Sequence, residues 1–116
     1  MNFTNEIDMI QFFANEYISP GNKVLVLGLC NPEIKSLIKF INAEVFCVSN
    51  QPGLNVDIIA DYDDLPFEEK SFDIIINFTQ VINFNFLKEN GVTLVNENIL
   101  NAREYYHSNQ NVFSII

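Results

Sequence analysis

Positive charge is scarce in this sequence of 116 residues, which has 6 Lys and Arg against 15 Asp and Glu. The six basic residues are scattered along the chain rather than clustered: Lys23, Lys35, Lys39, Lys70, Lys88 and Arg103. Nonspecific binding to nucleic acid requires clustered Lys and Arg that neutralise phosphates. The net charge of −9 therefore argues against direct nucleic-acid binding, and equally against an anionic membrane surface as a partner.

Histidine and cysteine are also scarce. The single histidine, His107, falls at the end of an expected helix, where a surface position is the ordinary interpretation. Cys30 and Cys47 have neither CxxC nor metal-ligand spacing, and we expect two buried, reduced thiols. The acidic stretch 61–69 lacks the glycine and the further oxygen ligands of a calcium loop. The sequence thus predicts no metal site and indicates no catalytic residue.

Long hydrophobic runs are missing as well. The longest apolar region, 74–86, is too short and too interrupted by Asn to span a bilayer. The first residues are acidic and polar, so we expect no secretion signal or transit peptide and a cytoplasmic protein. A hydrophobic content of 48% without low-complexity tracts predicts one globular domain over 1–116.

Apolar runs alternate with helical patterns along the chain. We predict strands over 23–28, 43–49, 56–61, 72–78, 92–97 and 112–116, and helices over 4–18, 31–41, 84–91 and 98–107. Asn31 followed by Pro32 marks a helix start. Between Val48 and Val56 there are too few residues for a helical crossover. The order predicts an α/β fold, a three-layer Rossmann-like parallel sheet with helices on both faces.

Four predicted strand ends define the candidate site. The first strand ends at Gly28, the second at Ser49, the third at Asp61 and the fourth near Asn77. In open parallel sheets, ligands bind outside the carboxyl ends of the strands, where the strand order reverses. We therefore expect these four positions to meet at one edge of the sheet.

Several segments resemble class I S-adenosylmethionine-dependent methyltransferases. The most specific is ADYDDLPFEEKSFDIII (60–76), which has the family's order of acid, Leu-Pro-Phe, acidic turn, Ser-Phe-Asp and apolar strand. KVLVLGLCNPE (23–33), AEVFCVSNQP (43–52) and FLKENGVTLV (86–95) are similar to its first strand with the glycine loop, its second strand and the entry to its fifth. The resemblance covers roughly residues 20 to 97 and implies a truncated methyltransferase-like fold.

The resemblance also implies roles for the strand-end residues. Asp61 would face the adenine amino group of S-adenosylmethionine, with the Tyr62 backbone beside the ring. Gly28 would let the methionine end of the cofactor approach the chain. Ser49 stands where the family places the acid that binds the ribose hydroxyls, and Asn77 matches only the Asn of an Asn-Pro-Pro-aromatic motif found in some amino-methylating relatives.

Departures from the family pattern weaken the expected cofactor site. Val26, Cys30 and Pro32 replace an acid and two glycines of the first strand and its loop, and Ser49 replaces the ribose acid. Losing a charged acceptor removes roughly 1.5 to 3 kcal/mol per hydrogen bond, a factor of about ten to a hundred or more in affinity, so losing the bonds to both ribose hydroxyls would turn a micromolar ligand into a millimolar one. The same changes also argue against NAD or NADP as the cofactor. The expected function is a methyltransferase-like domain with a degenerate cofactor loop and weak or no autonomous activity.

Two alternatives remain open at this point. One is a noncatalytic pseudo-methyltransferase that acts as a structural or regulatory partner subunit, and the other is a binding module for another nucleoside or small metabolite. We also expect a homodimer or a hetero-complex, because 11 Phe in a short chain favour an exposed apolar patch. The candidate surfaces are NFNF (83–86), beside a short connection, and VFSII (112–116), as a strand at the sheet edge.

Overall fold

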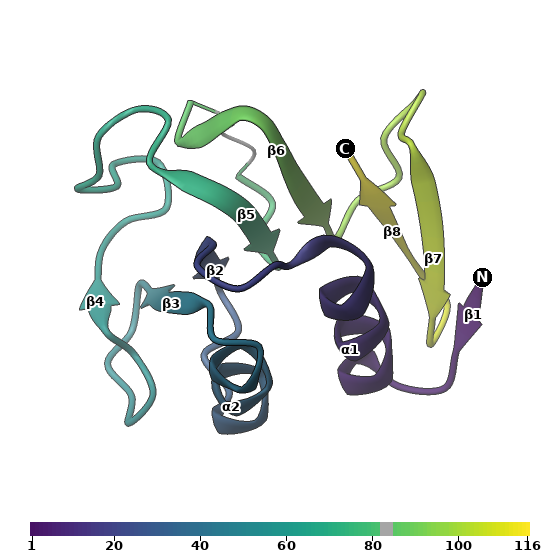
Figure 1. Ribbon diagram of the computed structural model, residues 1–116, viewed down its shortest axis with the longest axis horizontal. Coiled ribbons are helices and arrows are strands. Elements are labelled where there is room, and N and C mark those ends of the chain that lie inside the picture. The colour runs from purple at the N-terminus through teal and green to yellow at the C-terminus, as the bar shows by residue number, and fades with distance from the viewer. Residues whose placement is uncertain (82–84) are drawn as a thin grey trace.

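One sheet organises the chain in the computed structural model, which describes residues 1–81 and 85–116. Within these residues it has eight strands in the order β1-β7-β8-β6-β5-β2-β3-β4 (Figure 1). Their bounds are β1 Asn2–Phe3, β2 Lys23–Leu27, β3 Glu44–Ser49, β4 Ile58–Ile59, β5 Phe72–Asn77, β6 Leu87–Val95, β7 Glu104–Ser108 and β8 Asn111–Ile115. Every neighbouring pair is parallel except those of β8, which runs antiparallel to β6 and β7.

Two helices form as the sequence predicts. Helix α1 spans Glu6–Tyr17, and its cap residue Asn5 accepts a hydrogen bond from the Asp8 amide at 2.9 Å. Helix α2 spans Pro32–Phe40, with the Asn31 side chain accepting from the Glu33 amide at 2.7 Å. These side-chain oxygens satisfy amides that the first helical turn leaves free, so the polar signals fix where each helix begins.

Both helices pack on the same face of the sheet, and they contact each other (Figure 1). Their buried side chains share one core with inward-facing residues of the central strands: Met9, Ile10, Phe13, Ala14, Ile34, Ile38, Val24, Val26, Ile74, Ile76, Val92 and Leu94. The α/β, Rossmann-like fold class is confirmed. The expectation of helices on both faces is not met, because the described residues place no helix on the second face.

A loop and aromatic side chains cover part of that second face. Leu25, Leu27, Val48 and Ile75 face a smaller core, to which the loop 60–71 adds Leu65 and Phe67, and the chain beside it adds Phe72 and Phe86. Phe67 lies edge-on to Phe72 with ring centroids 5.0 Å apart, and edge-on to Phe86 at 6.2 Å. Packed aromatic side chains therefore cover the middle of this face, where no helix lies.

The predicted helix over 84–91 is wrong for the part that the structure describes. Residues 87–91 belong to β6, which pairs with β5 in parallel after a register shift. Asn90 adopts a positive φ of 67° within this shift, so the Asn-Gly signal marks a bulge in a strand and not the end of a helix.

The predicted helix over 98–107 is also wrong. Tyr106 and Ser108 are buried on alternate positions of β7, whereas His107 between them is exposed. Asn109 and Gln110 both have positive φ and connect β7 to β8 as a two-residue hairpin loop. The short turn and the period-two burial favour a strand here.

Of the two surfaces expected to be exposed, one is contradicted and the other is only partly described. VFSII does not form an edge, because β8 lies between β6 and β7. In NFNF, Phe86 is buried, and Asn83 and Phe84 lie outside the described residues. In the part of the chain described, no helix has the length and apolarity needed to cross a membrane.

Candidate functional site

The carboxyl ends of four strands meet at one edge, as the sequence predicts. Leu27 at the end of β2 pairs with Val48 of β3 on one side and with Asn77 of β5 on the other. Ser49 at the end of β3 pairs with Ile59 of β4. The connections reverse direction between β2 and β5, which is the position where doubly wound sheets bind ligands. We call this row of strand ends the carboxyl edge.

Gly28 follows β2 directly and is closely surrounded. Its amide donates to the Val48 carbonyl at 3.1 Å, and its φ of 88° is one that residues with a side chain rarely adopt. A Cβ atom at this position would lie 2.9 Å from Cγ2 of Thr79 and 3.5 Å from the carbonyl carbon of Phe78. Glycine is required here, and the space beside it is filled by the chain's own residues.

Asn77 is the residue that holds Thr79 in this place. The Asn77 side chain is buried, and its Oδ1 accepts from the Thr79 amide at 2.8 Å and from the Thr79 hydroxyl at 2.6 Å. Its Nδ2 donates to the Val81 carbonyl at 2.9 Å. These bonds fold the segment after β5 into a tight turn, so the Asn77 amide group is occupied by protein partners.

Ser49, Asp61 and Tyr62 lie together at the β3–β4 part of the edge. The Ser49 carbonyl accepts from the Ala60 amide at 3.0 Å, and its hydroxyl oxygen accepts from the Gln51 amide at 3.1 Å. The Tyr62 hydroxyl accepts from the Asn50 amide at 3.3 Å, which ties the segment after β4 to the one after β3.

Asp61 differs from these neighbours. Its side chain is exposed, and within the described residues no hydrogen bond or ion pair engages its carboxylate. Because a carboxylate is an acceptor only, it is available to an amine or amide donor from outside the chain.

A polar contact that was not predicted lies behind the edge. Asp57 accepts from the Cys47 amide and from Lys35 Nζ, each at 2.8 Å, and its own amide donates to the Cys47 carbonyl at 2.9 Å. Partial burial acts to raise the pKa of Asp57, but the bonds from Lys35 and Cys47 outweigh it and hold the pKa below its usual 3.8. This contact joins α2 to the segment before β4.

Thr79 was missed too, although a signal for it exists. An Asn followed two residues later by Thr is a common turn-forming pair, in which the Asn side chain bonds the backbone ahead of it. Thr79 has no counterpart in the Asn-Pro-Pro-aromatic motif with which this stretch was aligned.

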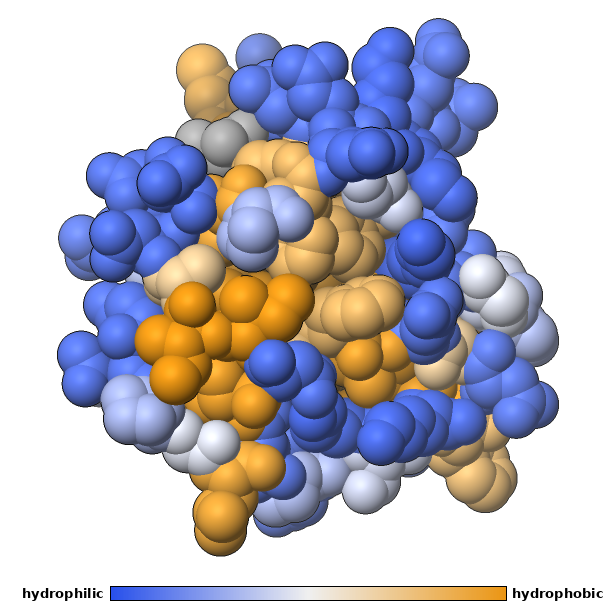
Figure 2. Space-filling model, turned by 90° about the vertical axis from the view of Figure 1, so that its left-hand side faces the viewer, coloured by the Kyte–Doolittle hydropathy of each residue, from blue (hydrophilic) through white to orange (hydrophobic). Residues whose placement is uncertain are grey.

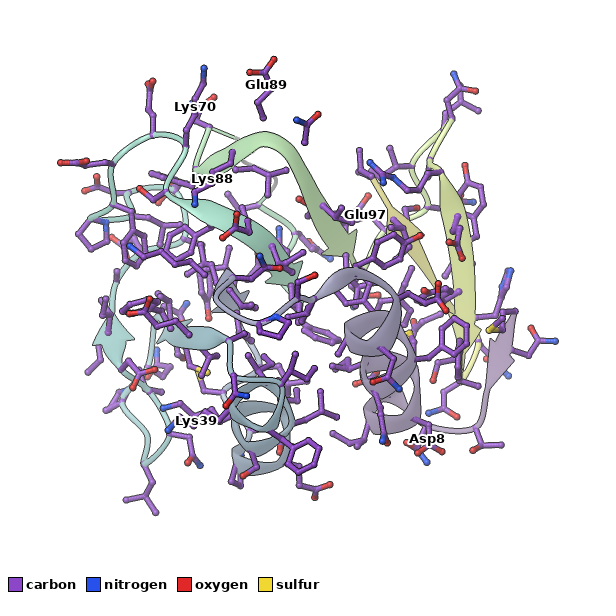
Figure 3. All side chains as sticks on the ribbon, viewed as in Figure 1. Asp8, Lys39, Lys70, Lys88, Glu89 and Glu97 are labelled. Carbon is purple, nitrogen blue, oxygen red and sulfur yellow. The ribbon has the colours of Figure 1, made fainter. Side chains whose placement is uncertain are left out.

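The two cysteines are free thiols. Burial raises the pKa of both, and that of Cys47 reaches about 12. At neutral pH these groups are protonated, and a protonated thiol is a poor nucleophile. In the part of the chain that is described, no three His, Cys, Asp or Glu side chains gather where they could hold a metal ion. Figure 3 shows the charged residues Lys70, Lys88 and Glu89 at the opposite end of the sheet, where β5 and β6 begin.

Solved structures with this arrangement of elements are mainly methyltransferases. The PH0226 protein of Pyrococcus horikoshii is similar over 87% of this chain and 56% of its own, with a TM-score of 0.63 and 19% identity. Coclaurine N-methyltransferase, solved with N-methylheliamine and SAH, is similar over 78% of this chain and 35% of its own, with a TM-score of 0.60 and 20% identity. The chain has a class I methyltransferase-like fold.

A third structure with this methyltransferase-like fold was solved with a partner protein. It is the complex between the Haloferax volcanii Trm112 methyltransferase activator and a methyltransferase, similar over 76% of this chain and 55% of its own, with a TM-score of 0.53 and 14% identity. The chain spans about half the length of the structures that it matches first. No protein-family model and no curated protein sequence matches it.

Proposed function

We propose that this chain is a methyltransferase-like domain that holds the adenosine half of S-adenosyl compounds weakly and transfers no methyl group on its own. Its fold and the order of its strand ends support a ligand at the carboxyl edge. Asp61 would accept from the adenine amino group, and the Tyr62 backbone would lie beside the ring. Asp61 suits this role because its carboxylate is exposed and unengaged among the described residues.

The contact between Gly28 and Thr79 carries the proposal. A methionine group that approached the Gly28 backbone would meet Cγ2 of Thr79, which lies 2.9 Å from the Cβ position of Gly28. Asn77 holds Thr79 there with two hydrogen bonds. The methionine half of the cofactor therefore gains little on binding, and the residues present fit the adenosine half only.

The ribose end of the site lacks a charged acceptor. The Ser49 hydroxyl is neutral, and its oxygen already accepts from the Gln51 amide. A carboxylate in its place would add roughly 1.5 to 3 kcal/mol for each hydrogen bond to the diol. We accordingly expect dissociation constants for S-adenosyl compounds in the millimolar range, which corresponds to a binding free energy on the order of 4 kcal/mol.

Calorimetric titration tests this function. S-adenosylmethionine, S-adenosylhomocysteine and adenosine are each titrated to millimolar concentration into the wild-type chain. The expected result is saturable binding with similar affinities for all three ligands, because only the shared adenosine half makes contacts. In Asp61→Ala the apparent affinity for each ligand should fall about tenfold or more, which is the contribution of one hydrogen bond to a charged group.

Asp63→Ala is the matched control, because Asp63 is an exposed acid on the same loop. It removes the same charge and should leave binding unchanged. Equal losses in the two variants, or an affinity for S-adenosylmethionine ten times that for adenosine, would contradict the proposed site.

A noncatalytic partner subunit is the second candidate function. It is favoured by the methyltransferase of similar fold that was solved with an activator protein. Absence of heat with all three ligands would support this candidate over the first. A homodimer or hetero-complex, a cytoplasmic location and a single domain over 1–116 stay predictions under either function.

A further inference from the structure

Cys30 and Cys47 come from different elements and meet behind the carboxyl edge. Cys47 lies in β3 and pairs in register with Val26 of β2. The Gly28 amide donates to the Val48 carbonyl, so the loop that follows β2 stays beside β3. Cys30 lies in this loop and packs against the core cluster that contains Cys47. A hydrogen bond joins the two thiols, which places their sulfur atoms in contact.

The two thiols differ in their access to solvent. Cys30 is half-buried, whereas Cys47 is 0% exposed. Figure 2 faces the β4 side of the sheet, beside β3, where packed hydrophobic and hydrophilic side chains form the surface. A reagent from solvent therefore meets Cys30 first, and Cys47 reacts only with a group that Cys30 already carries.

Charge and hydrogen bonding also distinguish the two thiols. Burial raises the pKa of both, but the hydrogen bond from Cys47 and the positive charge of Lys35 act to lower that of Cys30. The same hydrogen bond acts to raise the pKa of Cys47. The remaining charged group beside the pair is Asp57, which accepts from Lys35 Nζ and from the Cys47 amide. Of the two thiols, Cys30 is therefore the one that gives up its proton first.

We propose that Cys30 and Cys47 form a thiol pair that a small disulfide, such as glutathione disulfide, oxidises reversibly to an intramolecular disulfide. The Cys30 thiolate attacks one sulfur of the small disulfide, whose S–S bond breaks, and the leaving thiolate takes up the proton that Cys30 lost. The Cys47 sulfur then attacks Cys30, and its proton goes to the second leaving thiolate. The protein loses two hydrogen atoms, and the small disulfide is reduced to two thiols.

The new bond would connect helix α2 to β3. Cys30 directly precedes Asn31, whose side chain caps α2. A bond from Cys30 to Cys47 would therefore fix the start of this helix, and the loop after Gly28, against β3. It would also close a loop in the unfolded chain, so the oxidised protein should be the more stable form. This inference uses no contact with an adenosine ligand and is independent of the proposed function.

A redox titration of the wild-type chain tests the pair. The protein is equilibrated in glutathione buffers of increasing disulfide-to-thiol ratio, quenched with acid, alkylated and weighed by mass spectrometry. We expect a monomer that loses two hydrogen atoms and both alkylation sites together, and that regains them with dithiothreitol. Because both thiols are protonated at pH 7, equilibration should take on the order of hours. The midpoint of thermal unfolding should rise by about 10 °C on oxidation.

Two single variants test the order of the steps. Cys47→Ala should stop at a glutathione adduct on Cys30, because the second thiol is missing. Cys30→Ala should leave Cys47 reduced, because Cys47 is buried. Thermal unfolding under reducing conditions checks that each variant folds, and the wild-type titration needs no substitution.

Three results would overturn the proposal. The first is a wild-type chain that stays reduced in the most oxidising buffer. The second is oxidation that yields only disulfides between chains, or stable glutathione adducts on both cysteines. The third is an adduct on Cys47 in folded Cys30→Ala as abundant as the adduct on Cys30 in Cys47→Ala, which would mean that the two thiols do not act in sequence.

Discussion

Asp57 illustrates how one side chain supports the candidate site without belonging to it. Its two carboxylate oxygens accept from Lys35 Nζ and from the Cys47 amide. The first bond holds helix α2, and the second holds β3 at Cys47, one residue before β3 begins to pair with β4. The segment that leads into β4 is thereby fixed against β3, the strand that ends at Ser49.

The acid dependence of stability follows from the pKa of Asp57. Because the folded-state pKa lies below the usual 3.8, ionised Asp57 contributes stability that is fully present above about pH 4. That contribution is lost as the pH falls through the folded-state value. We expect Asp57→Ala to lower the free energy of unfolding by about 1 kcal/mol at pH 7, a modest value because the carboxylate is partly exposed.

Urea denaturation of wild type and Asp57→Ala at pH 7 and at pH 2.5 measures this prediction. The difference in the free energy of unfolding should be about 1 kcal/mol at pH 7 and smaller at the lower pH. Asp63→Ala serves as the comparison, since it removes an exposed acid elsewhere. A difference between Asp57→Ala and wild type that stays constant down to the lower pH would refute the assigned role of the carboxylate.

At the scale of elements, the bulge in β6 depends on Gly91. A Cβ atom there would lie 2.6 Å from Cδ1 of Leu87 and 2.9 Å from the backbone oxygen of Asp73. The leucine side chain can turn away, but the backbone oxygen belongs to β5 and cannot move alone. We expect Gly91→Ala to cost about 1 to 3 kcal/mol in the free energy of unfolding, the usual range for an overpacked interior.

Thermal or urea unfolding of Gly91→Ala against Gly53→Ala checks this expectation. A Cβ at Gly53 would approach only Cγ2 of Val56, at 3.3 Å, and that side chain lies in a surface segment. The Gly53 variant should therefore stay within about 0.5 kcal/mol of wild type, as surface substitutions usually do. Equal stability of the two variants would show that the bulge tolerates a side chain.

Local chemistry explains which elements were predictable. The helix starts at Asn5 and Asn31 depend on caps within three residues. The cap at Asn31 was predicted, whereas for the first helix both Thr4 and Asn5 were possible caps and the structure uses Asn5. The central strands are continuous apolar runs and were found as well. The segment 87–91 becomes a strand because β5 pairs with it across the intervening loop, which leaves little local signal. The segment 104–108 pairs with β8 in a hairpin, and its local signal, the turn at Asn109 and Gln110, was not recognised.

The candidate site divides in the same way. Gly28, Ser49 and Asn77 were placed at strand ends from the sequence, and the register brings those ends together. Asp61 was expected at the end of the third strand, but β4 ends at Ile59 and Asp61 lies two residues beyond it. Thr79 was not foreseen, because its position over Gly28 depends on the tight turn that Asn77 builds after β5. A side chain that reaches the site from the connection after a neighbouring strand can be predicted only when the strand pairing is known.

The whole molecule has the sheet of a methyltransferase-like fold, with connections between β3, β4 and β5 that contain no helix. Two helices cover one face, and aromatic residues and a loop cover part of the other (Figure 1). The short turn after β5 closes over Gly28, and the connections around β4 leave Ile59 exposed.

The most direct measurement of this account compares ligand affinities of the wild-type chain, Thr79→Ala and Thr79→Val by calorimetry. Alanine removes the methyl group that lies over Gly28, whereas valine keeps a methyl group there and removes only the hydroxyl. The account predicts that Thr79→Ala binds S-adenosylmethionine several times more tightly than wild type, with adenosine affinity unchanged in all three proteins. An unchanged S-adenosylmethionine affinity in Thr79→Ala, or an equal gain in Thr79→Val, would contradict the claim that Thr79 closes the site.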